Sequence, residues 1–240
     1  LYRRGPRGVW QRISTPGDLS TGQAWYDWYV AAAPDVDTQV YLGAIEVHRG
    51  DLSGSNWAWT TISAKQSGDS IHPDQHAITF HPTDPNTIFA GNDGGLYRSP
   101  NRGVNWESLN AGLAIAEIEY MAQDPGSARW LMGGTQDNGT ISYPGGATWD
   151  HIADGDGGDC AVNSIDPNMI FHSYFYMGLD RSTDRGQTWK WIPTASRDPN
   201  VYRQLFYPPV DGRGDTIAQA GESVFVSRDN GDHWAQFALP

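Results

Sequence analysis

Ser182-Thr-Asp184-Arg-Gly186-Gln-Thr188-Trp189 is the clearest copy of a pattern that this chain repeats. Two further copies are Ser227-Arg-Asp229-Asn-Gly231-Asp-His-Trp234 and Ser99-Pro-Asn101-Arg-Gly103-Val-Asn105-Trp106. All three read S-x-D/N-x-G-x-x-W. In such a segment the serine and aspartate side chains can bond the backbone amides of a tight turn. The glycine can take a positive φ, and the tryptophan supplies a large apolar face. The pattern therefore predicts a structural turn between two strands.

Weaker copies extend the repeat along the chain. The segment 49–57 keeps the spacing of 98–106, the segment 145–149 is a shortened copy, and 1–10 matches 96–106 with one residue fewer. The tryptophans that end the six copies lie 40 to 49 residues apart, at Trp10, Trp57, Trp106, Trp149, Trp189 and Trp234. A four-stranded blade of a β-propeller has about this length.

A second landmark precedes the turns. It is a Pro/Asp/Asn turn that leads into a short apolar strand, as in Pro82-Thr-Asp-Pro-Asn86-Thr-Ile88-Phe-Ala-Gly91. The sequence therefore predicts an all-β fold, a single β-propeller of four-stranded blades over residues 1–240. The predicted blades are a half blade at 1–13 and full blades at 24–63, 74–110, 114–152, 157–193 and 201–238.

The half blade leaves two arrangements open. A propeller normally closes by pairing its first and last strands, which removes the exposed sheet edges. The chain is then either part of a larger propeller, completed by a second chain or a missing segment, or a five-bladed propeller with an N-terminal extension.

Composition narrows the classes of partner. The formal net charge of −12 argues against nucleic acid and anionic membranes and suits sugars or metal ions. No apolar run approaches the roughly 20 residues of a membrane span. The single cysteine, Cys160, excludes an internal disulfide, and we expect it to be a buried small apolar residue.

Propeller geometry would gather polar loops at one rim. The loops inside the blades that face this rim contain Gly-rich runs such as 91–95 and 133–139, and the linkers between blades supply further polar and aromatic residues. We expect the ligand-binding residues to be Tyr26, Trp28, Asp74, His76, Asn92, Gln136, Asp137, Asn138 and Arg203. Convergent polar groups are typical of a ligand site. The alternatives are ordinary tight turns for the Gly-rich runs and core packing for the aromatic residues.

Asp74 and His76 suggest a metal-binding site. Residues two apart on a strand share a face, so these two side chains, with nearby carboxylates, would form a site of nitrogen and oxygen ligands. Ca²⁺ or another divalent ion suits an oxygen-rich rim, and the sequence implies no other cofactor. The alternative for His76 is a hydrogen-bonded residue of the channel wall.

The repeated pattern resembles the Asp-box, or BNR repeat, of β-propellers found in sialidases, xyloglucanases and sortilin-type receptors. The segment Asn92-Asp93-Gly94-Gly95-Leu-Tyr97-Arg98 resembles the part of glycoside hydrolase family 74 that carries a catalytic aspartate. The segment Gly155-Asp156-Gly157-Gly158 resembles the part that carries its partner. The resemblance implies that Asp93 is the general base and Asp156 the general acid of a glycoside hydrolase.

The same resemblance implies a secreted protein, extracellular or periplasmic, that binds or acts on carbohydrate. Sortilin-like receptors share the repeats, so a non-catalytic propeller that binds a peptide or protein is the alternative. The repeats specify a fold more closely than a function.

Overall fold

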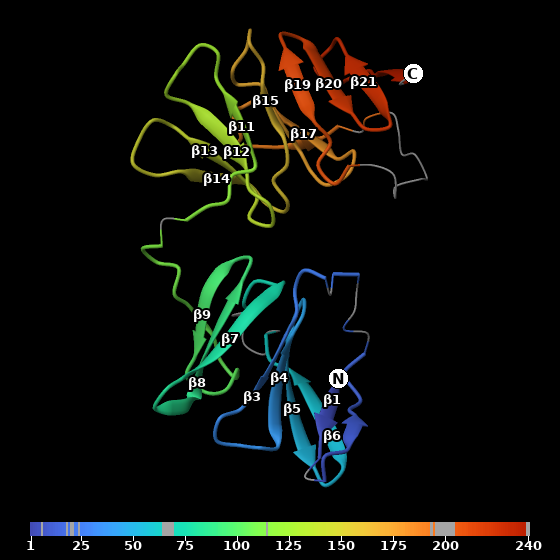
Figure 1. Cartoon of the computed structure of the whole chain (residues 1–240). Coiled ribbons are helices and arrows are strands. Elements are labelled where there is room, and N and C mark those ends of the chain that lie inside the picture. Colours follow the sequence, from blue (N-terminus) through green and yellow to red (C-terminus); the bar gives the residue numbers. More distant parts are fainter. Residues whose placement is uncertain are drawn as a thin grey trace. The chain divides into compact units, whose positions relative to one another are not determined.

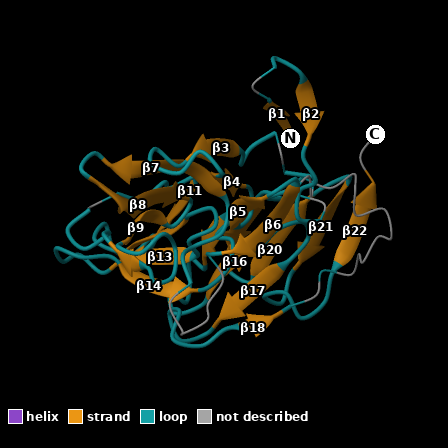
Figure 2. Ribbon diagram, turned by 90° about the horizontal axis from the view of Figure 1, so that it is seen from below, coloured by secondary structure: helices purple, strands orange, loops and turns teal. Residues whose placement is uncertain are grey.

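The computed structural model describes residues 1–5, 7–17, 19, 22–23, 25–63, 70–113, 115–192, 194 and 205–238. Within these ranges every regular element is a β-strand (Figure 2), and no helix could cross a membrane. The chain divides into two compact units, Leu1–Ala114 and Ile115–Pro240 (Figure 1). The sequence predicts one domain over the same residues. Each unit is described by itself.

The first unit contains a hairpin and two four-stranded sheets. The hairpin pairs β1 (Tyr2–Arg4) with β2 (Trp10–Arg12). One sheet consists of β3 (Tyr29–Ala32), β4 (Gln39–Gly43), β5 (Val47–Ser53) and β6 (Asn56–Thr61). The other consists of β7 (Gln75–His81), β8 (Asp84–Asn92), β9 (Gly95–Ser99) and β10 (Glu107–Ser108).

The second unit contains three four-stranded sheets. The first is β11 (Tyr120–Gln123), β12 (Leu131–Gly134), β13 (Thr140–Tyr143) and β14 (Asp150–Ala153). The second is β15 (Cys160–Val162), β16 (Ile170–Ser173), β17 (Leu179–Ser182) and β18 (Lys190–Trp191). The third is β19 (Val210–Arg213), β20 (Thr216–Ala220), β21 (Ser223–Ser227) and β22 (Ala235–Ala238).

All five full sheets have the same topology. Their strands pair antiparallel in sequence order, which is the order of a propeller blade. The first strand of a sheet contacts the first strand of the next within each unit, as β3 does with β7 and β15 does with β19. The predicted all-β fold with propeller-type blades is confirmed.

Alternation of side chains along the strands builds the core. In β8, Ile88, Ala90 and Asn92 are buried while the residues between them are partly exposed, as the two-residue period of a strand requires. Ile88 and Tyr41 belong to one apolar cluster shared by the two sheets of the first unit. Burial of an isoleucine of this kind contributes about 2 kcal/mol.

The repeated serine turn has the predicted contacts. In the copy at 182–189, the Ser182 hydroxyl accepts a hydrogen bond from the Gly186 amide at 2.8 Å and donates to Asp184 at 2.7 Å. Asp184 in turn accepts from the Thr188 amide at 2.8 Å. Gly186 has a φ of 92°, which explains the glycine at this position. In the other two copies the serine hydroxyl likewise accepts a hydrogen bond from a glycine amide, that of Gly103 or Gly231.

The tryptophans of the repeat have different surroundings, and the indole of Trp234 donates within its own turn, to the Gly231 carbonyl at 3.1 Å. The indole of Trp106 donates to the Ile62 carbonyl at 2.7 Å, and that of Trp189 donates to the Ile152 carbonyl at 2.6 Å. Each bond therefore joins a turn to the preceding sheet. Trp10 is 64% exposed and so does not have the buried position that the repeat predicts. Its copy lacks the serine that orders the turn.

Candidate functional site

The linker before β3 exposes three aromatic side chains. The amides of Tyr26 and Asp27 donate to the Gln23 carbonyl at 2.7 and 3.2 Å, which makes a turn. Trp25 is 84% exposed, and Tyr26 and Trp28 are about half-exposed. Asp27 is turned inward and is 1% exposed. The turn thus presents aromatic rings on its surface above one buried carboxyl group.

Asp74 stands at the same end of the sheets, directly before β7. Its amide donates to the Ile45 carbonyl at 2.9 Å, and its φ is 62°, a left-handed conformation that aspartate tolerates. Its carboxylate accepts a hydrogen bond from Gln23 Nε2 at 3.1 Å. Burial, with the nearby charge of Asp93, raises the pKa of Asp74.

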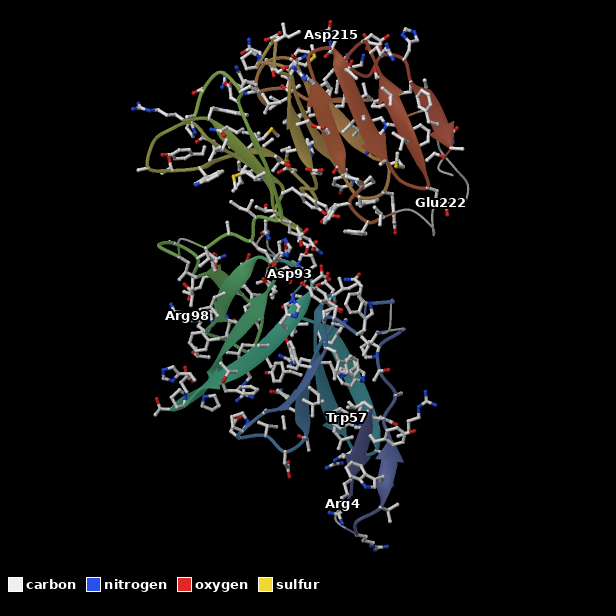
Figure 3. The ribbon with its side chains drawn as sticks, turned by 45° about the horizontal axis from the view of Figure 1, so that its top comes forward. Arg4, Trp57, Asp93, Arg98, Asp215 and Glu222 are labelled. Atoms are coloured by element: carbon white, nitrogen blue, oxygen red, sulfur yellow. The ribbon has the colours of Figure 1, made fainter. Side chains whose placement is uncertain are left out.

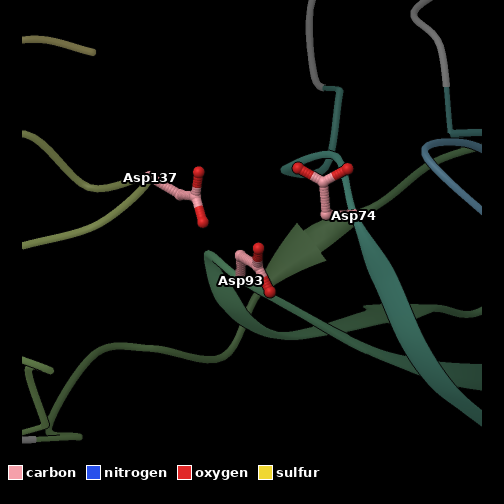
Figure 4. A group of neighbouring side chains, drawn as sticks. All are labelled: Asp74, Asp93 and Asp137. Carbon is pink, nitrogen blue, oxygen red and sulfur yellow. The ribbon is translucent and has the colours of Figure 1, made fainter. Parts of the chain in front are cut away.

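Asp93 lies in the turn between β8 and β9 (Figure 3). The Tyr26 hydroxyl donates to its Oδ1 at 3.2 Å, and His76 Nε2 lies 2.5 Å from the same oxygen. Asp74 and Asp93 each offer a carboxylate oxygen within 4.8 Å of the other (Figure 4). The first unit therefore brings together four predicted site residues from three separate segments.

Asp27 belongs to this group, although the sequence reasoning does not select it. Its carboxyl group is buried and lies beside that of Asp74. The ionisable groups that act on it are Asp74 and His76. Burial, with the charge of Asp74, raises the pKa of Asp27. The sequence signal was an acidic residue enclosed by aromatic residues just before a strand.

Asn92 has a supporting position. Its Nδ2 donates to the His72 carbonyl at 2.9 Å, and its Oδ1 accepts from the Gly94 amide at 3.1 Å. Gln75 Nε2 also donates to the His72 carbonyl, at 2.6 Å. These bonds fix the segment that carries Asp74. The predicted contact of Asn92 with a ligand stays a prediction.

The second unit gathers the other predicted rim residues. In the loop after β12, Asn138 Nδ2 donates to the Gln136 carbonyl at 3.1 Å, and Asp137 has a φ of 59°. Asp156 lies in the linker before β15. Burial raises the pKa of Asp156, and a side-chain interaction with Asp137 opposes this shift. The proposed catalytic residues are thus on different units, Asp93 on the first and Asp156 on the second. Arg203 lies outside the described residues.

Asp159 and Cys160 have structural roles in the second unit. The Asp159 carboxylate accepts hydrogen bonds from the amides of Cys160 and Val210, both at 2.8 Å. It therefore joins the first strands of two neighbouring sheets. Cys160 is buried, as expected, and burial raises the pKa of its thiol, which keeps it protonated.

An aromatic cluster forms in the second unit between the loop that joins β16 to β17 and the linker before β19. Phe175 stacks on Phe206 at 6.1 Å between ring centroids, and Tyr176 packs edge-on against Phe206. The Tyr176 amide donates to the Phe206 carbonyl at 2.6 Å. Phe175, Phe206 and the adjacent Leu205 are exposed. The sequence reasoning missed this phenylalanine pair, because the two rings are 31 residues apart.

No family model matches the chain, and no curated protein matches it. Among solved structures, it is similar to the GH74 xyloglucanase from Xanthomonas campestris, at 18% identity and a TM-score of 0.41, over 87% of this chain and 38% of that one. It is similar to an ancestral GH74 enzyme at 18% identity and a TM-score of 0.40, over 88% of this chain and 31% of that one. It is similar to YCF48 from Cyanidioschyzon merolae at 15% identity and a TM-score of 0.40, over 84% of this chain and 69% of that one. The chain therefore spans about a third of the two GH74 enzymes.

Proposed function

We propose that this chain binds carbohydrate through the linker end of its first unit. The observation that carries the proposal is the turn that exposes Trp25, Tyr26 and Trp28, together with the hydrogen bond from Tyr26 to the Asp93 carboxylate, which lies near that of Asp74. A sugar ring has apolar C–H faces that stack on aromatic rings and hydroxyl groups that donate to carboxylates. A secreted location would suit this role and stays a prediction.

The aromatic residues would provide most of the binding free energy. An indole that is 84% exposed, as in Trp25, has a large apolar surface to bury against a ligand. Exposed aromatic groups that lie together commonly mark interaction surfaces. Trp25 contacts the Tyr26 ring at 5.6 Å between centroids, so the two rings already form a continuous surface.

The carboxylates would provide orientation. Asp93 is held by Tyr26 and His76, and Asp74 is held by Gln23. Because these contacts limit side-chain motion, little conformational entropy would be lost when a sugar hydroxyl binds. A hydrogen bond to a charged acceptor is also stronger than one between neutral groups.

Affinity electrophoresis with xyloglucan, cellulose oligosaccharides and chitin oligosaccharides tests the proposal. Trp25→Ala should weaken binding about tenfold, since losing roughly 60 Å² of buried apolar surface costs about 1.5 kcal/mol. Trp10→Ala is the matched control, because Trp10 is exposed in the same unit but belongs to the terminal hairpin. Absence of binding to every glycan, or equal loss in both variants, would contradict the proposal.

Hydrolysis is tested with the same polysaccharide and oligosaccharides. The resemblance to glycoside hydrolase family 74 assigns acid and base roles to Asp156 and Asp93, and glycoside hydrolysis uses two carboxyl groups. Release of reducing ends that is abolished in both Asp93→Asn and Asp156→Asn would make the chain an enzyme. Binding without release of reducing ends would make it a carbohydrate-binding module.

The exposed phenylalanine pair favours a second candidate function, the binding of an apolar peptide. Phe175, Phe206 and Leu205 present apolar surface in the second unit. A peptide array would show binding to aliphatic or aromatic sequences, and Phe206→Ser would abolish it. Wild-type binding that Phe206→Ser leaves unchanged would exclude this surface.

A further inference from the structure

We infer that the second unit binds an organic cation, an alkylammonium group, beside the hydroxyl group of Tyr207. The carboxyl groups around it belong to Glu119, Asp137 and Asp156, and these four residues are called the tyrosine site below. Glu119 lies just before β11, Asp137 in the loop after β12, Asp156 in the linker before β15 and Tyr207 in the linker before β19. All three sheets of the unit therefore contribute to the site. The carbohydrate surface proposed above belongs to the first unit.

The hydroxyl group of Tyr207 provides the observation that points to a ligand. Tyr207 is 9% exposed, and its hydroxyl oxygen has no hydrogen-bond partner in the part of the chain that the structure describes. Buried hydroxyl groups in proteins are nearly always paired, because an unpaired one is costly to remove from water. Burial, with the charge of Asp156, raises the pKa of Tyr207, so the hydroxyl group keeps its proton. A ligand bound there would supply the missing partner.

Packing places the Tyr207 ring against the segments that carry the carboxyl groups. The ring of Tyr120, the residue after Glu119, meets it edge-on at 5.9 Å between centroids. On another side the ring lies against Gly158, where an added Cβ atom would be 2.7 Å from the ring atom Cδ1. Asp156 is two residues before that glycine. The tyrosine is therefore enclosed by the starts of two neighbouring sheets.

Glycines let the loop after β12 approach the linker before β15. A Cβ atom on Gly134 would lie 1.9 Å from the Gly158 carbonyl oxygen, so only glycine fits there. The Gly157 amide also donates to the Thr135 carbonyl at 3.2 Å. The loop that contains Asp137 is thus held against the linker before any ligand binds. A preformed arrangement reduces the entropy lost on binding.

The charges around the hydroxyl group favour a cation. The carboxyl groups that act on Tyr207 are those of Asp156, Asp137 and Glu119, and the side chains of Asp156 and Asp137 also interact with each other. Within the described ranges, no lysine or arginine is among the groups that act on Tyr207 or Asp156. Carboxylates this close repel one another unless a proton or a cation lies between them. A cation with several N–H groups can donate to the phenol oxygen and to a carboxylate together.

The mixed lining selects an alkylammonium group over a metal ion. Calcium and magnesium prefer carboxylate, carbonyl and water oxygens, and the hydroxyl group of a neutral tyrosine is not among these ligands. The rings of Tyr120 and Tyr207 attract an ammonium group and can pack against the apolar stem of a lysine-like chain. The ligand is therefore the lysine side chain of a peptide or a free alkylamine.

NMR titration of the whole chain tests the inference. Nα-acetyl-lysine methylamide supplies the ammonium group, and Nα-acetyl-norleucine methylamide is its neutral counterpart. The lysine derivative should shift the amide signals of Gly157 and Gly158 with a Kd of about 1 mM, and binding should weaken as salt is added. The norleucine derivative should leave these signals unchanged. Titration with 1-aminopentane separates the two sources, because tighter binding than that of the lysine derivative would indicate a free amine.

Tyr207→Phe is the decisive variant, because it removes only the hydroxyl group. It should weaken binding of the lysine derivative about tenfold, since a hydrogen bond from a charged group is lost. Tyr29→Phe is the matched control. The Tyr29 hydroxyl oxygen is also buried without a hydrogen-bond partner among the described residues, and burial is the cause of its raised pKa, with no carboxylate involved. This control should keep the wild-type affinity, whereas Asp156→Asn should weaken binding at least as much as Tyr207→Phe.

Four results would overturn the inference. They are no binding of either amine to the wild type, equal shifts with the norleucine derivative, unchanged affinity in Tyr207→Phe or Asp156→Asn, and an equal loss in Tyr29→Phe. Sugar is absent from every titration. Failure to bind glycans would therefore contradict the proposed function and leave the tyrosine site standing.

Discussion

Asp27 in the first unit and Asp159 in the second occupy comparable places with opposite surroundings. Both lie in a linker just before the first strand of a sheet. Asp159 accepts hydrogen bonds from two backbone amides, those of Cys160 and Val210. Asp27 is buried against another carboxyl group, that of Asp74. One aspartate therefore stabilises the joint between two sheets, and the other is buried against a second carboxyl group.

The comparison shows how to separate structural from functional acidic residues in a repeat protein. Position in the blade does not distinguish the two kinds of residue, because the linkers are equivalent. They are distinguished by the atoms that surround each carboxyl group. A carboxylate surrounded by amide donors is satisfied by the fold, whereas a buried carboxylate that faces other carboxylates is not.

The largest effect should come from removing the satisfied carboxylate. Asp159→Ala should lower the free energy of unfolding of the second unit by about 2–4 kcal/mol, because two backbone amides lose a charged acceptor. Urea unfolding followed by tryptophan fluorescence measures this. A change under about 1 kcal/mol would show that solvent replaces the carboxylate and would remove the contrast with Asp27.

A smaller effect is expected in the serine turns. Ser182→Ala should cost about 1–2 kcal/mol, because the hydroxyl bonds the Gly186 amide and Asp184 inside the turn. Ser55→Ala is the control, because Ser55 is exposed in the turn between β5 and β6. Equal unfolding curves for both variants would contradict the structural role of the Ser182 turn.

A still smaller effect, of opposite sign, is expected for Asp27. Asp27→Asn should leave the free energy of unfolding unchanged or raise it by about 1 kcal/mol, because a buried carboxyl group beside a second one is replaced by a neutral amide that can donate to Asp74. Differential scanning calorimetry measures it. A loss of about 2 kcal/mol would mean that Asp27 is satisfied in the fold, as Asp159 is.

The smallest predicted effect concerns how the stability of the serine turns depends on pH. Hydrogen bonds from Thr188 and Ser182 lower the pKa of Asp184 to about 2, so the ionised carboxylate is favoured in the folded state. Its contribution to stability is present above the unfolded pKa of about 3.9 and is lost as the pH falls toward about 2. The turn at 99–106 has Asn101 at this position and lacks that dependence.

Tm measured between about pH 5 and about pH 2 checks this difference. The acid-induced fall should be shallower in Asp184→Asn than in the wild type, since the variant has no proton to bind at this position. Asp154→Asn, which changes a fully exposed carboxylate, serves as the control and should follow the wild-type curve. Identical slopes in Asp184→Asn and the wild type would contradict the assignment.

Much of the fold could be predicted because its signals are local. A serine, a glycine with positive φ and a tryptophan within eight residues specify a turn without reference to the rest of the chain, as Ser182, Gly186 and Trp189 show. The weaker copy that ends at Trp10 has no serine in its turn, and its tryptophan is exposed. Burial of the tryptophan depends on the turn that orders it.

The candidate site was less predictable because its contacts are not local. Tyr26, Asp74 and Asp93 were selected as polar rim residues, and the structure brings them together. Asp27 was not selected, although it is the most deeply buried acid of the group. Its carboxyl group meets that of Asp74, 47 residues away, and such a contact cannot be read from neighbouring residues in a sequence.

The sequence by itself determined the repeat, the strand order within each sheet and the turns between strands, because these depend on residues a few positions apart and on backbone preferences. Only the tertiary structure decided which carboxylates are satisfied. Asp159 finds the Val210 amide 51 residues away, and Asp27 meets Asp74 at a distance of 47 residues. The electrostatic environment of a side chain is set by whatever the fold brings to it, and for that physical reason the candidate site depends on contacts between sheets that are distant in the sequence.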